Sequence, residues 1–579
     1  MPPLSPRNIT DGYVSNIQNT VEHNIPYPVS VIGSASQICK DNASDTITVG
    51  LMPEESLIIT GSYYLHVISG EVEILGAVCK SRDKPYLIES PITDNAIPIH
   101  PSLMSNQSNS LSVRLPNEAV STCVRLFVSS FHCVVLLSSV KSNYNNWHDY
   151  HLEIKKNDTD DVLLEVAADS FLEPSSFCID GACLMTHFNV LSSEEIPKLA
   201  PPGVILLTPH WKQSMTDITS KEYSVTLVLG SKNVGKSTYC RCLVNSLLSH
   251  FSRVAFLDID VGQGEYVTEG ILTLSTIEEP QLRSSSVPCV KEPVFSRIFF
   301  GDRTPENRPQ DYNQVVSMLL HQYLTILSDC PLVINTCGWI KGVGADILNF
   351  IYYNIKCTNV VFIQDKTKKD SLPIINADPA SVIYLDSQPS ETKKVNPGYL
   401  RDQKVIAYFC GDHLSDLGNY LLTLPQYHLP FSSIQCYLGH IPSGYFHVAL
   451  NGSIVGLSAD SLFIPSVEIQ PSTEVKAGVV IPKAASSPKL LKSFPVVKNI
   501  GIGIVQAIDL NKNEVIIITS LSKKEMESVN TLIRSTEMIP LPLLQNHLSL
   551  PIHYYTSSSC GVGSLVARAR PNLKRIFPS

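Results

Sequence analysis

The spacing of apolar and polar residues changes character twice along this 579-residue chain. Up to about residue 195, short runs rich in β-branched and aromatic residues alternate with polar positions, as in SLIITGSYYLHVISGEVEILGAVC and RLFVSSFHCVVLLSSV. Such runs predict strands, and no long helical period interrupts them. Residues 1–198 are therefore predicted to form a β-rich domain of the sandwich type.

Continuous apolar runs and helical periods alternate from about residue 201 to 425. SVTLVLG, VAFLDID, PLVINT, NVVFIQ and SVIYL read as strands covered on both faces, and STYCRCLVNSLLSHF and QDYNQVVSMLLHQYLTIL read as helices between them. This alternation predicts a doubly wound α/β domain with a parallel sheet over residues 199–428.

Strand patterns return in residues 429–579. GYFHVALNGSIVGLS and NIGIGIVQAIDLNKNEVIIITSL predict strands with DLNKNEV as a hairpin turn, and segment 464–490, rich in Pro, Ser and Ala, predicts a surface loop. The predicted fold class is thus α/β, with a doubly wound parallel sheet flanked by an N-terminal β-rich domain and a C-terminal mixed, mainly β domain.

Composition narrows the class of protein. With 44% hydrophobic and 17% charged residues the chain is globular, and its net charge of −9 excludes a uniformly basic nucleic-acid coat while leaving room for a local basic patch. No apolar run approaches the ~20 residues of a membrane helix, and the N-terminus lacks a signal-peptide pattern. The 15 cysteines, scattered among apolar neighbours without a CxxC pair, favour buried thiols in a reducing compartment. We expect a soluble intracellular protein with no membrane partner.

The first chemical motif lies between a predicted strand and a predicted helix, in LVLGSKNVGKSTYCRCLVNSLL. It fits the P-loop pattern G-x-x-x-x-G-K-[ST], in which backbone N–H groups and a helix N-terminus bind phosphates. The lysine is expected to reach the β- and γ-phosphates of ATP, and the hydroxyl after it to hold Mg²⁺. The predicted nucleotide-binding residues are Gly230, Ser231, Lys232, Asn233, Val234, Gly235, Lys236, Ser237 and Thr238.

Two further motifs follow the next buried strands. In LDIDVGQGE, Asp258 and Asp260 are two apart, so both project from one face of a strand end; one suits Mg²⁺ or its waters and the other a nucleophile's proton. The plainer alternative is a solvated acidic turn. In INTCGWIKGVG, a glycine-rich loop carries Trp339, which suits either base stacking or a plug at a domain junction.

Together, GSKNVGKST, LDIDVGQGE and INTCGWIKGVG closely resemble the Walker A, Walker B and clasp elements of the polynucleotide 5′-hydroxyl kinase family, in that family's order. FFGDRTPENRPQDYNQVVSML, FHVALNGSIVGLS and NIGIGIVQAIDL resemble its nucleolar branch, which acts in ribosomal RNA processing. The resemblance implies transfer of the ATP γ-phosphoryl group to the 5′-hydroxyl of RNA, in the nucleus and nucleolus, during processing of a pre-rRNA internal transcribed spacer. It also implies an endoribonuclease partner subunit.

The resemblance assigns roles to individual residues. Lys236 becomes a catalytic phosphate ligand, Asp260 the general base, and Ser237 and Asp258 the Mg²⁺ ligands. Gln263, Thr336 and Trp339 belong to the substrate-binding elements.

Arginines are sparse in the region where the family's lid is expected. The family closes its active site with a lid that carries arginines, and Arg401 is the single arginine between Arg308 and Arg534, so it takes the predicted lid position. Lys393 and Lys394 stand where a second lid arginine is expected, but lysine lacks the bidentate guanidinium fork. The basic C-terminal stretch LVARARPNLKRIFPS suits contact with RNA or a partner as well as simple solvation.

Two alternatives to an active kinase follow from the sequence. An ATP-binding scaffold subunit of an RNA-processing complex remains open because the lid cations are irregular. A GTPase switch is disfavoured because no N-K-x-D motif follows a strand of the α/β region.

Overall fold

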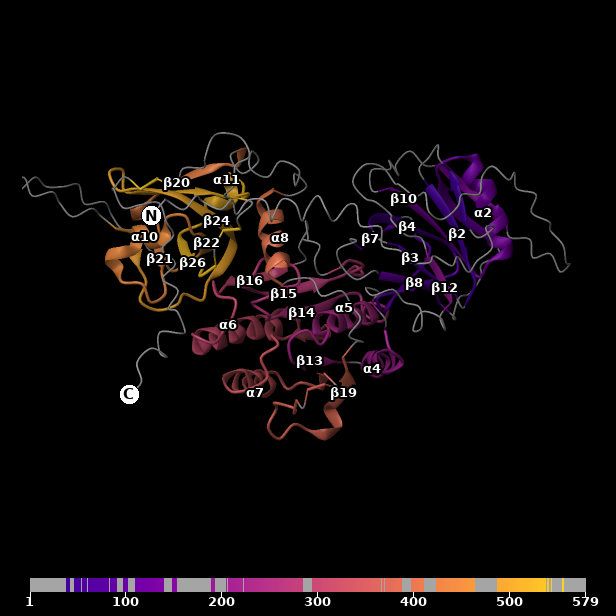
Figure 1. Cartoon of the computed structure of the whole chain (residues 1–579), viewed down its shortest axis with the longest axis horizontal. Coiled ribbons are helices and arrows are strands. Elements are labelled where there is room, and N and C mark those ends of the chain that lie inside the picture. The colour runs from indigo at the N-terminus through magenta and orange to yellow at the C-terminus, as the bar shows by residue number, and fades with distance from the viewer. Residues whose placement is uncertain are drawn as a thin grey trace, which may run out of the picture.

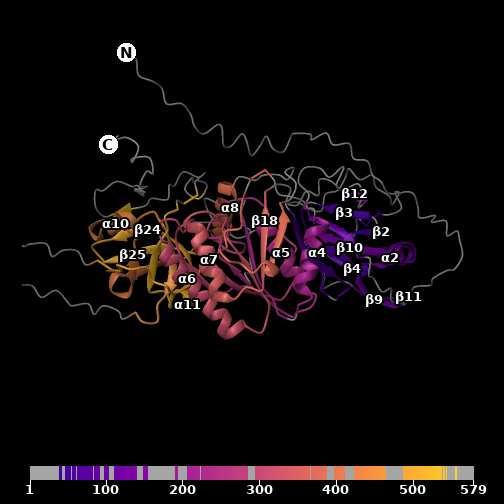
Figure 2. The same ribbon diagram turned by 90° about the horizontal axis from the view of Figure 1, so that it is seen from below.

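The computed structural model shows three β-containing lobes in a row, with the N-terminal lobe at one end, the α/β lobe in the middle and the C-terminal lobe at the other end (Figures 1 and 2). It describes residues 38–153, 189–192, 205–463, 487–543 and 555–556, except for gaps at 42–45, 54, 60, 83, 91–96, 103–109, 140–147, 206, 222, 285–293, 366, 369, 388–396, 411–422, 538 and 541–542.

The N-terminal lobe has two five-stranded antiparallel sheets, ordered β1-β2-β10-β4-β7 and β12-β3-β8-β5-β6, and a β9–β11 ribbon. The prediction of a β-rich region is therefore confirmed for the described residues. The strands are β1 Ile38–Asp41, β2 Thr46–Leu51, β3 Glu55–Ile59, β4 Gly61–Ser69, β5 Val72–Ile74, β6 Ala77–Cys79, β7 Tyr86–Ser90, β8 Ile97–Pro101, β9 Ser110–Leu115, β10 Cys133–Ser139, β11 His148–Glu153 and β12 Asn189–Ser192.

One helix in this lobe contradicts the sequence-based expectation of strands alone. Helix α2 spans Glu118–Ser130, and the side chain of Asn117 accepts a hydrogen bond from the backbone N–H of Val120 at 2.9 Å, which caps its first turn. Its buried residues Val120, Val124 and Phe127 recur at helical spacing. The β-branched residues on this face gave the segment its strand-like composition, but the cap and the period decide the structure.

The central lobe is a seven-stranded sheet ordered β16-β15-β14-β17-β13-β18-β19. The neighbours in β14-β17-β13-β18-β19 pair in parallel, whereas β15 pairs antiparallel with both β14 and β16. The predicted doubly wound domain is confirmed, with an antiparallel edge that the sequence did not reveal. Its strands are β13 Val225–Gly230, β14 Val254–Asp258, β15 Ile271–Ile277, β16 Val294–Phe299, β17 Leu332–Asn335, β18 Asn359–Gln364 and β19 Val382–Asp386. Its helices are α4 Pro209–Thr219, α5 Lys236–Leu247, α6 Pro309–Gln322, α7 Val343–Ile355 and α8 Pro397–Cys410.

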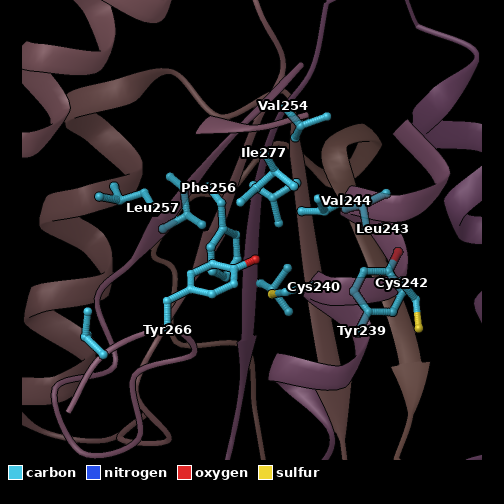
Figure 3. Packing of buried hydrophobic residues seen from close by; sticks show 14 of the residues in the cluster. Tyr239, Cys240, Cys242, Leu243, Val244, Val254, Phe256, Leu257, Tyr266 and Ile277 are labelled. Carbon is cyan, nitrogen blue, oxygen red and sulfur yellow. The ribbon is translucent and has the colours of Figure 1, made fainter. Parts of the chain in front are cut away.

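The core beneath α5 consists of its own buried side chains and those of β14, β15 and the loop before β15 (Figure 3). The rings of Phe256 and Tyr266 pack edge to face with centroids 5.8 Å apart. Cys240 and Cys242 are buried in the same cluster, and burial raises the pKa of the Cys242 thiol to about 12. These two thiols therefore behave as small apolar groups, as the scattered cysteine pattern predicts.

The C-terminal lobe is an eight-stranded sheet ordered β20-β25-β24-β22-β26-β21-β23, with β27 paired to β24. DLNKNEV forms the predicted hairpin turn, but the strand predicted for GYFHVAL is wrong, because Phe446–Leu450 is the short helix α10, whose Phe446 and Leu450 point into the core. The strands are β20 Gln426–Pro430, β21 Gln435–Tyr437, β22 Ile454–Ala459, β23 Lys489–Leu490, β24 Lys498–Asp509, β25 Glu514–Ile518, β26 Thr531–Arg534 and β27 Tyr555–Thr556; helix α11 is Lys523–Met526.

Some predictions fall where the structure does not test them. Most of the predicted loop 464–490, Lys393, Lys394 and the basic C-terminal stretch lie outside the described residues. The domain boundaries 198/199 and 428/429 stay predictions. The strand β20 that spans the second boundary pairs with β25 of the C-terminal sheet.

The turn between β5 and β6 docks the N-terminal lobe on helix α5. The amide Nδ2 of Asn245 donates hydrogen bonds to the carbonyl of Leu75 at 3.0 Å and to that of Gln281 at 3.1 Å. Gly76 has φ +79°, and a Cβ there would lie 2.7 Å from the carbonyl oxygen of Cys242. Both the backbone conformation and the close approach to α5 therefore require glycine.

Gly76→Ala is expected to destabilise the fold by about 1–3 kcal/mol, because it combines left-handed backbone strain with overpacking. The free energy of unfolding from urea titration measures it. Gly444→Ala is the matched control, since Gly444 has no atom within 4 Å of its Cβ position and no positive φ. Equal stability of the two variants would contradict this account of the docking turn.

Candidate functional site

The P-loop connects the end of β13 to helix α5 through three residues with positive φ. Gly230 has φ +151°, Asn233 +66° and Gly235 +99°, and a Cβ on Gly230 would lie 2.5 Å from the carbonyl oxygen of Ile363 in β18. Glycine is therefore needed where the loop leaves the sheet. The buried side chain of Val234 anchors the loop to the core, while Lys232 and Asn233 are exposed at its tip.

Lys236 begins helix α5, and only 6% of its surface is exposed. Its ammonium Nζ donates a hydrogen bond to the carbonyl of Ser231 at 3.0 Å, while the Ser231 hydroxyl oxygen is buried without a hydrogen-bond partner. Burial lowers the pKa of Lys236, and the carboxylate of Asp260 opposes that shift. The ammonium thus folds back on the loop's own carbonyl, and anionic phosphate oxygens would be a stronger acceptor at the same place.

Asp258 ends β14 in register with Asn335, the last residue of β17. The Asn335 amide Nδ2 donates to Asp258 Oδ1 at 3.0 Å and approaches the Ser237 hydroxyl at 3.4 Å. Parallel pairing of β13, β14 and β17 therefore gathers the P-loop hydroxyl, the amide and the first carboxylate at one edge of the sheet. Asn335 was missed as a site residue by sequence reasoning, because its role depends on this register.

The two acidic side chains have different surroundings. The backbone N–H of Glu265 donates to Asp258 Oδ2 at 2.5 Å, yet burial raises the pKa of Asp258 to about 7. The side chain of Asp260 accepts hydrogen bonds from the N–H groups of Gly262 at 3.0 Å and Gln263 at 3.3 Å. Burial raises the pKa of Asp260 as well, and Lys236 is the main opposing charge. Neither residue is part of a solvated acidic turn, which was the plainer sequence-based alternative.

The donor set beside the P-loop fits a magnesium ion. Ser237 and Asp258 supply a hydroxyl and a carboxylate, and Mg²⁺ commonly combines one or two such ligands with waters and substrate phosphates. Within the described residues, no group of three or more His, Cys, Asp or Glu side chains could hold a metal by itself. A cation at Asp258 would also stabilise the ionised form of a carboxyl that burial otherwise disfavours.

The clasp loop after β17 packs directly on the P-loop. The Thr336 hydroxyl donates to the carbonyl of Val228 at 2.7 Å, so this side chain supports strand β13. A Cβ on Gly338 would lie 2.7 Å from the Cα of Lys232, and one on Gly344 would lie 2.7 Å from Trp339 Cγ. The clasp therefore places partly buried Trp339 next to the phosphate-binding loop and over the start of α7.

Helix α8 presents two cations three residues apart to the loop that follows Asp260. Arg401 Nε lies 2.9 Å from Glu269 Oε2, and Lys404 Nζ donates to the carbonyls of Gly264 and Glu265. Because residues three apart share a helix face, both cations fasten α8 to this loop, hereafter the Walker B loop, residues 260–269. Lys404 was missed by sequence reasoning, which considered arginines and the two lysines at 393 and 394.

A buried ion pair lies under the same loop. The Arg241 guanidinium donates through Nη2 and Nε to one oxygen of Glu265, at 2.7 and 3.0 Å, and both side chains are about 95% buried. Arg241 and Lys404 hold the pKa of Glu265 below its usual value despite its burial. Glu265 is therefore an ionised support for the loop and was also missed, although the GQGE sequence placed an acid there.

A seven-stranded α/β sheet with a P-loop, a strand-end acid pair and a clasp at its carboxyl edge defines a P-loop nucleotide-binding phosphotransferase. Residues 230–411 match the family described as mRNA cleavage and polyadenylation factor CLP1 P-loop, and residues 483–540 match the NOL9-like C-terminal domain. The chain belongs to the NOL9 family of polynucleotide 5′-hydroxyl kinases, and the predicted family is confirmed.

The membership rests on the first of the two relatives described next. The polynucleotide 5′-hydroxyl-kinase NOL9 of Arabidopsis thaliana is 30% identical over 374 residues, which cover 58% of this chain and 92% of that protein. The kinase of the same name from Danio rerio is 24% identical over 569 residues, 88% of this chain and 74% of that protein. A solved structure of a wild-type Clp1p–Pcf11p complex aligns with 86% of this chain at 11% identity and a TM-score of 0.45. None of the described helices is long and apolar enough to cross a bilayer.

The P-loop assignment predicts a selective effect on nucleotide binding. Lys236→Ala is expected to weaken ATP binding at least tenfold, since the buried ammonium is the cation of the loop that faces Asp260. Lys232→Ala is the matched control, because that lysine is exposed at the tip of the same loop. Isothermal titration with ATP measures both dissociation constants, and a Lys236→Ala protein that binds like the control would contradict the assignment.

Proposed function

We infer that this chain is an ATP-dependent polynucleotide 5′-hydroxyl kinase that acts on RNA. The observation that carries the inference is the meeting of Lys236, Asp258 and Asp260 at the carboxyl edge of one sheet, in a chain that belongs to this kinase family. The P-loop N–H groups, Lys236 and Thr238 bind the phosphates of ATP. Bound Mg²⁺, held by Ser237 and Asp258, supplies charge neutralisation at the β- and γ-phosphates.

The proposed reaction is an in-line phosphoryl transfer. The RNA 5′-oxygen forms a bond to the γ-phosphorus while the bond from that phosphorus to the bridging oxygen of ADP breaks, and ADP leaves. Asp260 accepts the proton of the 5′-hydroxyl; its carboxylate is held in place by the N–H groups of Gly262 and Gln263. Arg401 stabilises the transferred group, and Gln263 and Trp339 form the substrate-binding side, while Thr336, predicted with them, is buried and supports β13 through its hydroxyl.

The finer part of the proposal concerns where the enzyme works. We propose a pre-rRNA substrate with a 5′-hydroxyl end produced by an endoribonuclease partner subunit, and a nuclear and nucleolar location. The resemblance of the FFGDRTP segment and of the C-terminal strands to the nucleolar branch supports these statements. The match of residues 483–540 to the NOL9-like C-terminal domain supports them too.

An ATP-binding scaffold is the second candidate function. The observation that favours it is the ion pair of Arg401 with Glu269, because the carboxylate competes with a phosphate for the guanidinium. In a scaffold, ATP would stabilise the fold and the complex without being turned over.

Transfer of labelled γ-phosphate from ATP to a short 5′-hydroxyl RNA separates the two functions. The wild type is expected to phosphorylate the RNA, and Lys236→Ala is expected to lose at least 99% of the activity. Lys232→Ala again serves as the control. A wild type that binds ATP but transfers nothing, alone or with a co-purified nuclease subunit, would favour the scaffold.

Trp339→Ala is expected to raise the KM for RNA about tenfold while the KM for ATP changes little. The reason is that stacking on a base contributes about 1–3 kcal/mol and acts on the acceptor only. Trp339→Phe keeps an aromatic face and should recover most of the affinity. Steady-state kinetics with varied RNA measure both, and an unchanged KM for RNA in Trp339→Ala would return Trp339 to a packing role.

A further inference from the structure

Arg401 has an incomplete set of partners in this structure. Its Nε pairs with Glu269 Oε2 at 2.9 Å, and no other hydrogen bond or ion pair of Arg401 is recorded among the described residues. A guanidinium has five N–H donors, so most of them are available to a second anion. Glu269 Oε2 is buried and has no well-aligned hydrogen bond, so the ion pair is one of charge and proximity. Arg401 can therefore leave the Glu269 carboxylate for another anion without breaking a well-aligned hydrogen bond.

Helix α8 itself is fixed independently of Arg401. Lys404, one turn further along the same face, donates to the carbonyls of Gly264 and Glu265, and the N–H of Ile502 in β24 donates to the Tyr408 hydroxyl at 3.0 Å. The side chain of Arg401 can therefore change partner while the helix stays in place. With 20% of that side chain exposed, it also has access to the solvent side of the Walker B loop.

Glu269 is placed at the meeting point of three segments. It precedes Gly270, whose carbonyl accepts hydrogen bonds from the N–H groups of Phe300 at 2.7 Å and Gly301 at 3.0 Å. The carbonyl of Gly301 in turn accepts the N–H of Thr536 from the C-terminal lobe at 2.9 Å. The backbone around Glu269 is thus tied to the segment after β16 and, through that segment, to the C-terminal lobe.

The charges that face Glu269 come from each of these segments. Arg401 and Asp402 belong to α8, Arg303 follows β16, and Glu537 follows β26 and pairs with Arg303 at 3.3 Å. Burial, followed by the charge of Glu537, raises the pKa of Glu269 to about 7, and the two arginines only partly offset this. The ion pair therefore forms fully only above neutral pH and weakens as the pH falls.

We propose that Glu269 is a positioning residue that holds Arg401 between turnovers and releases it to the transferred phosphoryl group. The proposal rests on the proposed kinase function and deepens it: the arginine at the predicted lid position exchanges one anion, the Glu269 carboxylate, for another, the γ-phosphoryl group. The C-terminal lobe takes part through Glu537, whose negative charge weakens the hold of Glu269 on Arg401 by favouring protonation of Glu269.

Glu269→Gln keeps the shape of the side chain and removes the competing charge, which frees Arg401. We expect its kcat at pH 8.5 to exceed the wild-type value about fivefold, a factor at the upper end of what an exposed ion pair contributes, because this pair is mostly buried. The ratio of the two kcat values should fall towards one at pH 6, where the wild-type Glu269 is already protonated. Taking the ratio at each pH cancels the titration of every group that the two proteins share.

Two further variants separate exchange from a structural role. Glu269→Gln should have no effect in an Arg401→Ala background, whereas damage to the loop would persist there. Glu306→Gln is the control: this exposed carboxyl follows β16, has no ion pair among the described residues and is not among the charges that act on Glu269, so the variant should keep wild-type kcat and pH dependence.

The outcomes distinguish the exchange from the kinase function itself. An active wild type with a Glu269→Gln kcat that is unchanged or lower at pH 8.5, or with a ratio that does not depend on pH, would overturn the exchange alone. Arg401→Ala with wild-type kcat would do the same. A wild type that transfers no phosphate to RNA would overturn the proposed function and the exchange together.

Discussion

Charge compensation under the Walker B loop is the constraint on which the rest of the site depends. Asp258 and Glu265 are buried within a few residues of each other, and a buried carboxylate is tolerated only when cations and N–H groups replace the water it has lost. Lys236 and Arg241 come from helix α5 and Lys404 from α8. Helices α5 and α8 are therefore held against the same loop by cations that face the same carboxylates.

This arrangement couples catalytic geometry to fold stability. The N–H group that holds Asp258 belongs to Glu265, and the side chain of Glu265 is held in turn by Arg241. Removing one member of such a buried network leaves an unpaired charge, which costs far more than the pair contributes. Burial raises the pKa of Asp258 despite its backbone hydrogen bonds, and a bound cation would favour its ionised form.

The sequence predicted the parts of the site that are written as local patterns. A P-loop is one continuous segment between a strand and a helix, so Gly230, Gly235 and Lys236 could be assigned from spacing alone. Asn335 and Lys404 could not, because their roles arise from strand register and helix docking, which bring together residues far apart in the chain. Helix α2 was missed for a different reason. Its β-branched residues suit strands, whereas the side chain of Asn117 caps the first turn and favours the helix.

The two flanking lobes act on the central sheet in different ways. The N-terminal lobe docks on the phosphate-binding helix α5 through the Gly76 turn and the amide of Asn245, and on α4 through the ion pair of Glu73 with Lys212. The C-terminal lobe docks by charge and aromatic contact: Glu537 pairs with Arg303 at 3.3 Å, and the Arg308 guanidinium lies 5.1 Å from the Phe494 ring centroid.

Of these contacts, only those of the C-terminal lobe bring a charge next to Glu269 in the Walker B loop. A turn packed on α5 brings no charge to the acid pair, whereas Glu537 changes the protonation of Glu269 and hence the freedom of Arg401. A partner that binds the C-terminal lobe and shifts Glu537 would therefore change the ion pair of Arg401 with Glu269 without contacting the nucleotide. The physical requirement for such control is a carboxyl whose pKa lies near the working pH, and Glu269 meets it because it is buried next to a second acid.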